Sequence, residues 1–120
     1  MTFRQIATGT ATLCMALFVF LWFLPGPIYW LFALDPNAAA DVLARRAGAI
    51  FLGIGVLCLG SRDSEPSGAR LAIARGMAVI MLALTIAGLV EFSSGRVGPG
   101  IWLAILAETG FALLWLRHAR

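Results

Sequence analysis

Long runs of apolar residues, separated by short polar stretches, dominate the chain. Four of these runs, residues 6–24, 36–60, 69–92 and 98–116, are each close to the ~20 residues that a helix needs to cross about 30 Å of hydrocarbon. A segment within lipid must satisfy its own backbone hydrogen bonds, and none of the runs alternates as a barrel strand does, so each is predicted to be a helix. The pattern therefore predicts an all-α integral membrane four-helix bundle in a single domain, residues 1–120.

The polar stretches between the runs set the ends of the predicted helices. Residues 25–27 (Pro-Gly-Pro) end the first helix, because proline lacks an amide hydrogen and clashes with a continuing helix. The aromatic residues 28–32 are too few to span a membrane and are predicted to form a short interfacial segment between the first two helices. Asp35 is predicted to cap the second helix, and residues 61–68 form the one clearly hydrophilic loop.

The composition supports a membrane environment. Hydrophobic residues make up 61% of the 120 residues and charged residues 12%, against about 45–50% and about 25% in soluble domains. A disordered chain is excluded, because disorder requires low hydrophobicity and high net charge. Six acidic and nine basic residues are also too few to cover the surface of a small soluble domain. We therefore expect the lipid bilayer to contact most of the surface.

The basic residues are all arginine, and their positions predict the orientation of the chain. They are Arg4, Arg45, Arg46, Arg62, Arg70, Arg75, Arg96, Arg117 and Arg120. Six of them lie near the N-terminus, the 61–68 loop or the C-terminus, and three lie toward the opposite ends of the helices. The positive-inside rule places both termini in the cytoplasm of a multi-pass protein of the bacterial inner membrane. The arginines form no basic stripe, so nucleic acid is not an expected partner.

Residues that usually carry chemistry are few. Cys14 and Cys58 each lie inside an apolar run without CxxC spacing and are predicted to be buried as small hydrophobic residues. With a lone His118 there are too few ligands for zinc or haem, and no cofactor is expected. No nucleophile–base pair or nucleotide-binding loop is recognisable, so the sequence predicts a protein that is not an enzyme.

Ionisable residues within the predicted spans form the candidate site, an intramembrane polar cluster. Arg45 and Arg46 lie in the second span, and Glu108 lies about nine residues into the fourth, near the middle of the membrane, where a bare charge is costly. Glu91 lies at the outer end of the third span. The pairs Arg46–Glu108 and Arg45–Glu91 are expected, because an arginine side chain reaches ~6–7 Å.

Asp41 and Arg75 are possible partners of this cluster. Asp41 precedes Arg45 by four residues, which puts both on one face of a helix, and Arg75 competes with Arg46 for Glu108. Three interpretations stay open. The cluster is a functional site, either a proton-linked carboxylate or an anion-binding arginine pair; or its ion pairs only hold helices together; or the arginines reach the headgroups from a tilted helix.

Small residues and tryptophans indicate how the helices pack. Small residues recur at four-residue spacing, which allows close approach of helices within one molecule or between copies. The series are Ala40-Ala44-Gly48, Ala49-Gly53, Ala72-Gly76 and Ala83-Ala87. All four tryptophans lie near predicted span ends and are expected to anchor the chain at the membrane surface. They are Trp22, Trp30, Trp102 and Trp115.

The segment from Asp41 to Arg62 carries a family resemblance. It contains the run Ala-Arg-Arg-Ala-Gly-Ala-Ile-Phe-Leu-Gly-Ile-Gly at residues 44–55, and Glu108 lies in the last span. These features resemble small bacterial four-helix membrane proteins of the DoxX-like and related uncharacterised families. The resemblance covers the whole chain and implies an inner-membrane four-helix protein with no settled activity.

Two functions from different classes follow from these features. The apolar exterior and the scarcity of polar groups favour a non-enzymatic accessory or assembly subunit of a larger membrane complex, such as a respiratory or photosynthetic one. The charges within the spans favour a small transporter or channel that works as a homo-oligomer. An enzyme acting on a quinone or a lipid is a third possibility that rests on fold analogy alone.

Overall fold

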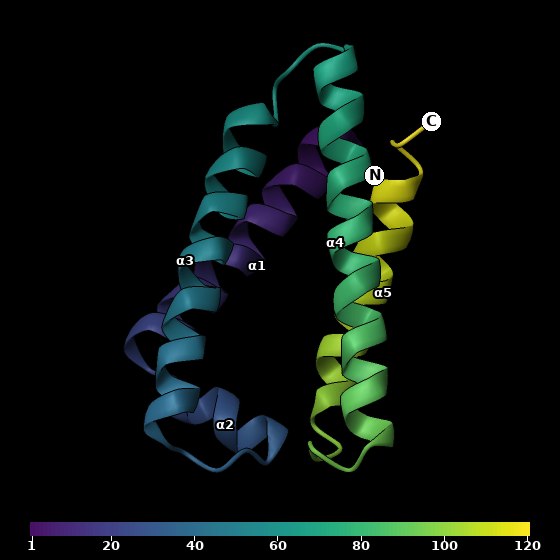
Figure 1. The fold of residues 1–120 in the computed structure, drawn as a ribbon. Helices are drawn as coiled ribbons and strands as arrows, with labels where there is room; N and C mark the ends of the chain where they lie inside the picture. The colour runs from purple at the N-terminus through teal and green to yellow at the C-terminus, as the bar shows by residue number, and fades with distance from the viewer.

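The computed structural model describes residues 1–120 and contains five helices and no strand. The helices are α1 (Phe3–Phe23), α2 (Gly26–Phe32), α3 (Ala38–Ser61), α4 (Gly68–Ser93) and α5 (Ile101–Leu116), as Figure 1 shows. The predicted all-α class is confirmed, and the expected interfacial segment is itself a helix, α2. Three helices, α1, α3 and α4, are long and apolar enough to cross a membrane, whereas the apolar α5 has only 16 residues.

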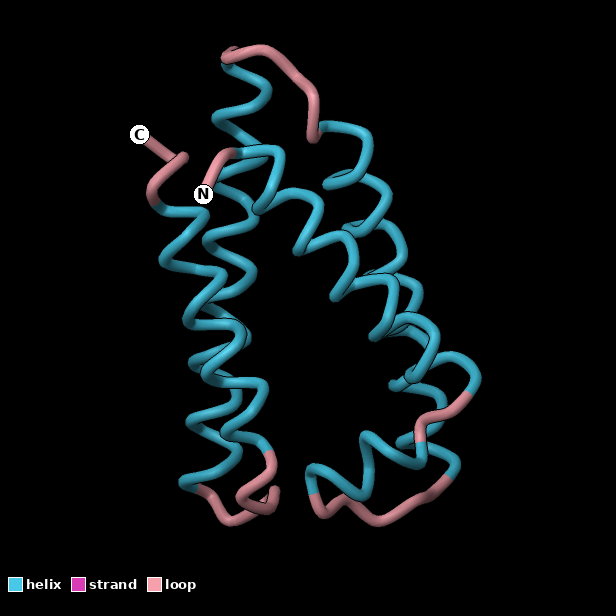
Figure 2. Tube along the Cα trace, turned by 180° about the vertical axis from the view of Figure 1, so that it is seen from behind, coloured by secondary structure: helices cyan, strands magenta, loops and turns pink.

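The four longer helices form two arms. α3 packs along α1 in the first arm, and α5 packs along α4 in the second. The arms meet at the end that holds both termini and the α3–α4 loop, and they diverge toward the end that holds α2 (Figures 1 and 2). The three segments predicted to share one side of the membrane therefore do lie at one end of the molecule.

The junction of the arms holds the larger hydrophobic core. It includes Phe3 and Ile6 from α1, Met77 from α4, and Trp115 from α5, all nearly inaccessible to solvent. The Trp115 indole Nε1–H donates a 3.0 Å hydrogen bond to Oγ1 of Thr10, which is equally buried. The expected surface-anchoring role of Trp115 is therefore wrong: its ring fills the junction, and the Thr10 hydroxyl supplies the partner that a buried indole needs.

Small residues on one face of α3 bring it close to α1. Ala44, Gly48 and Gly55 are buried there, and a Cβ atom added at Gly48 would lie only 3.3 Å from Leu21 Cβ. This face serves packing within the molecule, which is one of the two uses expected for the small-residue series. Gly53, by contrast, is exposed and has no neighbour within 4 Å of an added Cβ.

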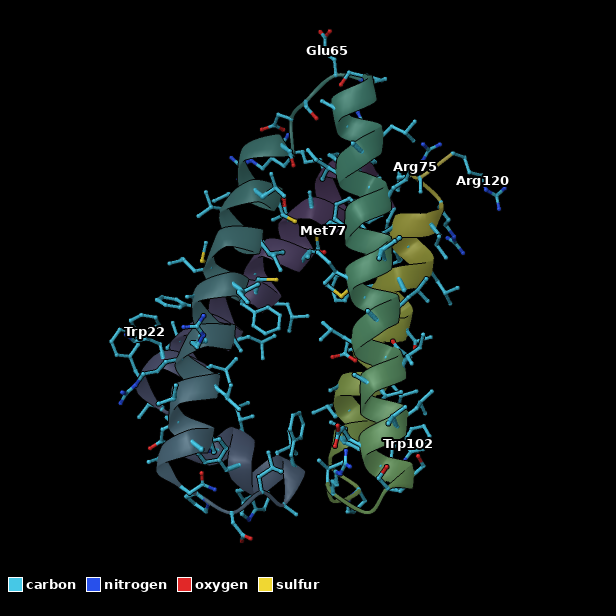
Figure 3. The ribbon with its side chains drawn as sticks, viewed as in Figure 1. Trp22, Glu65, Arg75, Met77, Trp102 and Arg120 are labelled. Atoms are coloured by element: carbon cyan, nitrogen blue, oxygen red, sulfur yellow. The ribbon has the colours of Figure 1, made fainter.

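The two cysteines are buried, and the three other tryptophans are exposed. Cys14 and Cys58 are fully buried free thiols, as predicted. Trp22, Trp30 and Trp102 are all exposed, and Trp22 points away from the first arm in Figure 3.

Helix α2 connects the arms at their open end. The Phe32 carbonyl at the end of α2 accepts a 2.8 Å hydrogen bond from the Gly98 N–H in the α4–α5 connection. A Cβ atom at Gly100 would overlap the Leu31 carbonyl oxygen, so this contact requires a glycine. The connection is thus held against α2, and α5 begins at Ile101 rather than at the expected residue 98.

The start of α3 also differs from the prediction. The capping residue is Asn37, whose side-chain oxygen accepts a 2.9 Å hydrogen bond from the Ala40 N–H. Asp35 was expected to cap this helix; instead its carbonyl oxygen accepts a hydrogen bond from the Asn37 side chain. Asparagine is as favourable at this capping position as aspartate. Asn37 directly precedes the first helical turn, and its backbone is extended, as a capping residue requires.

Candidate functional site

The structure separates the arginines and the glutamates of the predicted polar cluster. Arg45 and Arg46 are exposed on α3 and form no ion pair. Glu91 and Glu108 belong to the second arm. The expected pairs Arg45–Glu91 and Arg46–Glu108 are therefore wrong, because α3 packs on α1 while α4 packs on α5.

Glu91 forms its ion pair within its own turn. Its Oε1 lies 3.6 Å from Nη1 of Arg96, and both side chains are substantially exposed. Gly95, with φ of +68°, turns the chain back so that the Arg96 N–H also donates to the Glu91 carbonyl. The sequence signal for this pair is the five-residue separation across the Gly95 turn, and the expected Arg45–Glu91 pair overlooks it.

Asp41 contacts a tyrosine rather than Arg45. The Tyr29 hydroxyl of α2 donates a 2.9 Å hydrogen bond to Oδ1 of Asp41, and the Tyr29 side chain is buried. Burial, followed by the hydrogen bond to Asp41, raises the pKa of the Tyr29 hydroxyl, while the positive charge of Arg45 opposes these effects. The tyrosine therefore stays protonated near neutral pH and fixes α2 to the first turn of α3.

Glu108 lies in the middle of α5 and is half-buried without any ion pair. Arg75, expected to compete for this carboxylate, donates instead from Nε to the Ala119 carbonyl, 3.1 Å away. That contact places the Arg75 guanidinium at the terminal end of the second arm, next to the end of α5 (Figure 3). The expected Arg75–Glu108 contact is therefore wrong.

A cavity of about 340 Å³ brings the two glutamates to one site. Its wall is mostly apolar, and Glu91 and Glu108 are its only ionisable lining residues. The lining residues come from the end of α2 and the segment after it, from α4, from the α4–α5 connection and from α5: Phe32, Leu34, Leu84, Ala87, Gly88, Glu91, Val97, Ile101, Ala104 and Glu108. The candidate site is therefore an apolar cavity with two carboxylates, not a cluster of arginines and glutamates.

Helices α4 and α5, which both contribute lining residues to this cavity, pack closely at Gly88. A Cβ atom at Gly88 would lie 2.8 Å from Cγ1 of Ile105. Thr85 and Thr109 lie on the same pair of helices with their hydroxyl oxygens 3.4 Å apart, and each donates to the carbonyl four residues earlier in its helix. Their hydroxyl groups are thus satisfied within the arm.

The structure shows no metal site, and comparison with known proteins assigns no family. No three side chains of the types His, Cys, Asp and Glu come together. No family model, curated protein or solved structure matches the chain, so the resemblance to DoxX-like proteins stays a prediction.

Proposed function

We propose that this chain is a non-enzymatic subunit of a larger membrane assembly in the bacterial inner membrane, with both termini in the cytoplasm. The observation that supports this proposal is that Arg45, Arg46 and Glu108 lie within apolar helices and have no ionic partner in the chain. An ionisable residue at membrane depth costs roughly 2.5–3.5 kcal/mol on insertion scales and is almost always paired. A second chain is the natural source of the missing partners.

The orientation in this proposal rests on charge. Six arginines lie toward the end with the termini and three toward the other end. Cytoplasmic ends of spanning helices carry the excess of basic residues. The accessory partner would then approach α3 through the outer half of the membrane, where Arg45 and Arg46 lie seven and eight residues after the first residue of α3.

Co-purification from native membranes tests the subunit proposal. We expect a partner to co-purify with the extracted chain. The amount of partner that co-purifies with the Arg45→Gln/Arg46→Gln variant should fall more than about tenfold, because each ion pair with the partner loses its arginine. Arg62→Gln is the matched control: this arginine is in the loop and pairs with Asp63, so its loss should leave the partner bound. A single-chain particle with no partner, or equal loss in the control, would contradict the proposal.

A second candidate function is a small oligomeric transporter or channel, which the cavity with Glu91 and Glu108 favours. A half-buried carboxylate in an apolar wall can take up and release a proton as part of a transport cycle. The Arg/Glu cluster expected from the sequence is not available for this role, so the glutamates alone would carry it.

Proton flux into vesicles tests the transporter alternative. With the purified chain in vesicles that contain a pH-sensitive dye, we expect Glu108→Gln to abolish a pH-dependent flux, because an amide at this position cannot exchange a proton. Glu65→Gln, in the exposed α3–α4 loop, should leave the flux unchanged. A flux that Glu108→Gln does not alter would rule this alternative out.

A further inference from the structure

The end of the molecule that holds both termini has a strongly basic pocket. It measures about 320 Å³ and lies between the start of α4 and the end of the chain. Its lining residues are Pro66, Ser67, Arg70, Leu71, Arg117, His118 and Arg120. Three arginines and a histidine are thus among the residues of one pocket, and no aspartate or glutamate is.

Arg70 is held in place by two contacts. Its Nη1 donates a 2.9 Å hydrogen bond to the Ser64 carbonyl, and its guanidinium carbon lies 4.1 Å from the centre of the Phe3 ring. Phe3 is buried and packs edge-to-face on Trp115, with ring centres 5.5 Å apart. The junction core therefore supports the Arg70 guanidinium, so that this charge is positioned before any ligand binds.

The acidic residues nearest in sequence do not neutralise the pocket. Asp63 is engaged by Arg4 and Arg62, each with Nε 3.2 Å from a carboxylate oxygen. Glu65 projects away from the tip of the α3–α4 loop (Figure 3). Arg70, Arg117 and Arg120 form no ion pair. The arginine side chains that line the pocket therefore have no acidic side chain as a partner, and the ligand that complements them is an anion.

Exposed leucines lie in the last turn of α5, close in sequence to the pocket residues. Leu113 and Leu116 are exposed just before Arg117, and Leu71 lines the pocket itself. A ligand with a phosphate group and acyl chains would place its charge among the arginines and its chains on these leucines. Arginine binds phosphate through paired N–H donors, and basic pockets at the cytoplasmic ends of spanning helices suit anionic lipid headgroups.

We propose that the pocket between the start of α4 and the chain end binds the phosphate headgroup of an anionic phospholipid, with Arg70 and Arg117 as its main contacts. The bound lipid would bridge α4 and the segment after α5 at the junction of the arms. This role is independent of the partner subunit proposed above, because Arg45, Arg46 and Glu108 do not line the pocket.

Native mass spectrometry of the full chain in detergent tests this site. We expect the chain to retain added phosphatidylglycerol in preference to phosphatidylcholine with the same acyl chains. Arg70→Gln/Arg117→Gln should weaken retention about 30-fold, since one arginine near an anionic surface contributes about fivefold. Arg4→Gln/Arg62→Gln is the matched control: it removes two arginines at the same end that lie outside the pocket and pair with Asp63, and should change retention less than about fivefold.

Two further measurements distinguish the possible outcomes. Arg117→Gln alone, at an exposed position whose side chain forms no hydrogen bond or ion pair with the protein, should weaken retention about fivefold while the fold is unaffected. Inorganic phosphate should bind too weakly to displace the lipid. Equal retention of both lipids, equal losses in the two double variants, or displacement by inorganic phosphate would each overturn the lipid site, and the last would indicate a free-phosphate site.

Discussion

Replacing Trp115 with alanine is expected to destabilise the protein by about 3–5 kcal/mol. The indole is completely buried where the two arms meet, and it packs edge-to-face on Phe3. The substitution leaves a large void and removes the indole N–H that donates a hydrogen bond to the buried Thr10 hydroxyl. Because α1 and α5 have few other contacts, we expect the arms to lose their fixed relation. Unfolding of the purified chain in mixed micelles with a denaturing detergent, followed by circular dichroism, measures the effect.

Two variants separate the packing of Trp115 from its hydrogen bond. Trp115→Phe keeps an aromatic ring but removes the N–H, so it should cost about 1–3 kcal/mol, the penalty of an unsatisfied buried partner together with a smaller ring. Trp102→Ala removes a tryptophan that is 41% exposed and packs on Phe92, and should cost less than about 1.5 kcal/mol. If Trp115→Ala were no more harmful than Trp102→Ala, the junction would not depend on this side chain.

The sequence predicts the helices well because their cause is local. Apolar runs of about 20 residues demand helices in lipid, and the observed bounds of α1, α3 and α4 lie within three residues of the expected ones. The fourth run was expected to be longer than α5 is. Its start depends on contacts between the Gly98–Gly100 turn and α2, and these join segments more than 60 residues apart.

The polar cluster was predicted wrongly because it depends on which helices pack together. The sequence suggested that the second, third and fourth spans meet, whereas α3 packs on α1 through Ala44, Gly48 and Gly55. Arg45 and Arg46 follow Ala44 by one and two residues, so they point roughly 100° and 200° away from that face. The small-residue series therefore contained the signal: once it faces α1, the arginines must face away from α1.

The remaining contacts depend on the three-dimensional arrangement alone. Trp115 lies near a helix end, where tryptophan usually marks the membrane surface, and only its position opposite Thr10 makes it a core residue. The cavity likewise combines Glu91 and Glu108, which are 17 residues apart on different helices, with the end of α2. Neither result follows from spacing within one helix.

Replacing Gly48 with leucine is expected to force α1 and α3 apart and to destabilise the protein by at least about 2 kcal/mol. An added Cβ would lie 3.3 Å from Leu21 Cβ and 3.5 Å from the backbone nitrogen of Trp22. The backbone of α1 cannot move aside as a flexible side chain could, and the atoms beyond Cβ would extend further into α1. The same detergent unfolding experiment measures the loss of stability.

Gly53→Leu is the matched control for Gly48, on the same helix and with the same change of residue. An added Cβ at Gly53 meets nothing within 4 Å, and leucine favours a helix over glycine by up to about 1 kcal/mol, so this variant should be neutral or slightly stabilising. Equal effects at the two positions would mean that α3 does not contact α1 through this face. The face of α3 that contacts α1 would then be a different one. Arg45 and Arg46 would no longer have to face away from α1, and a partner for them in another chain would not be required.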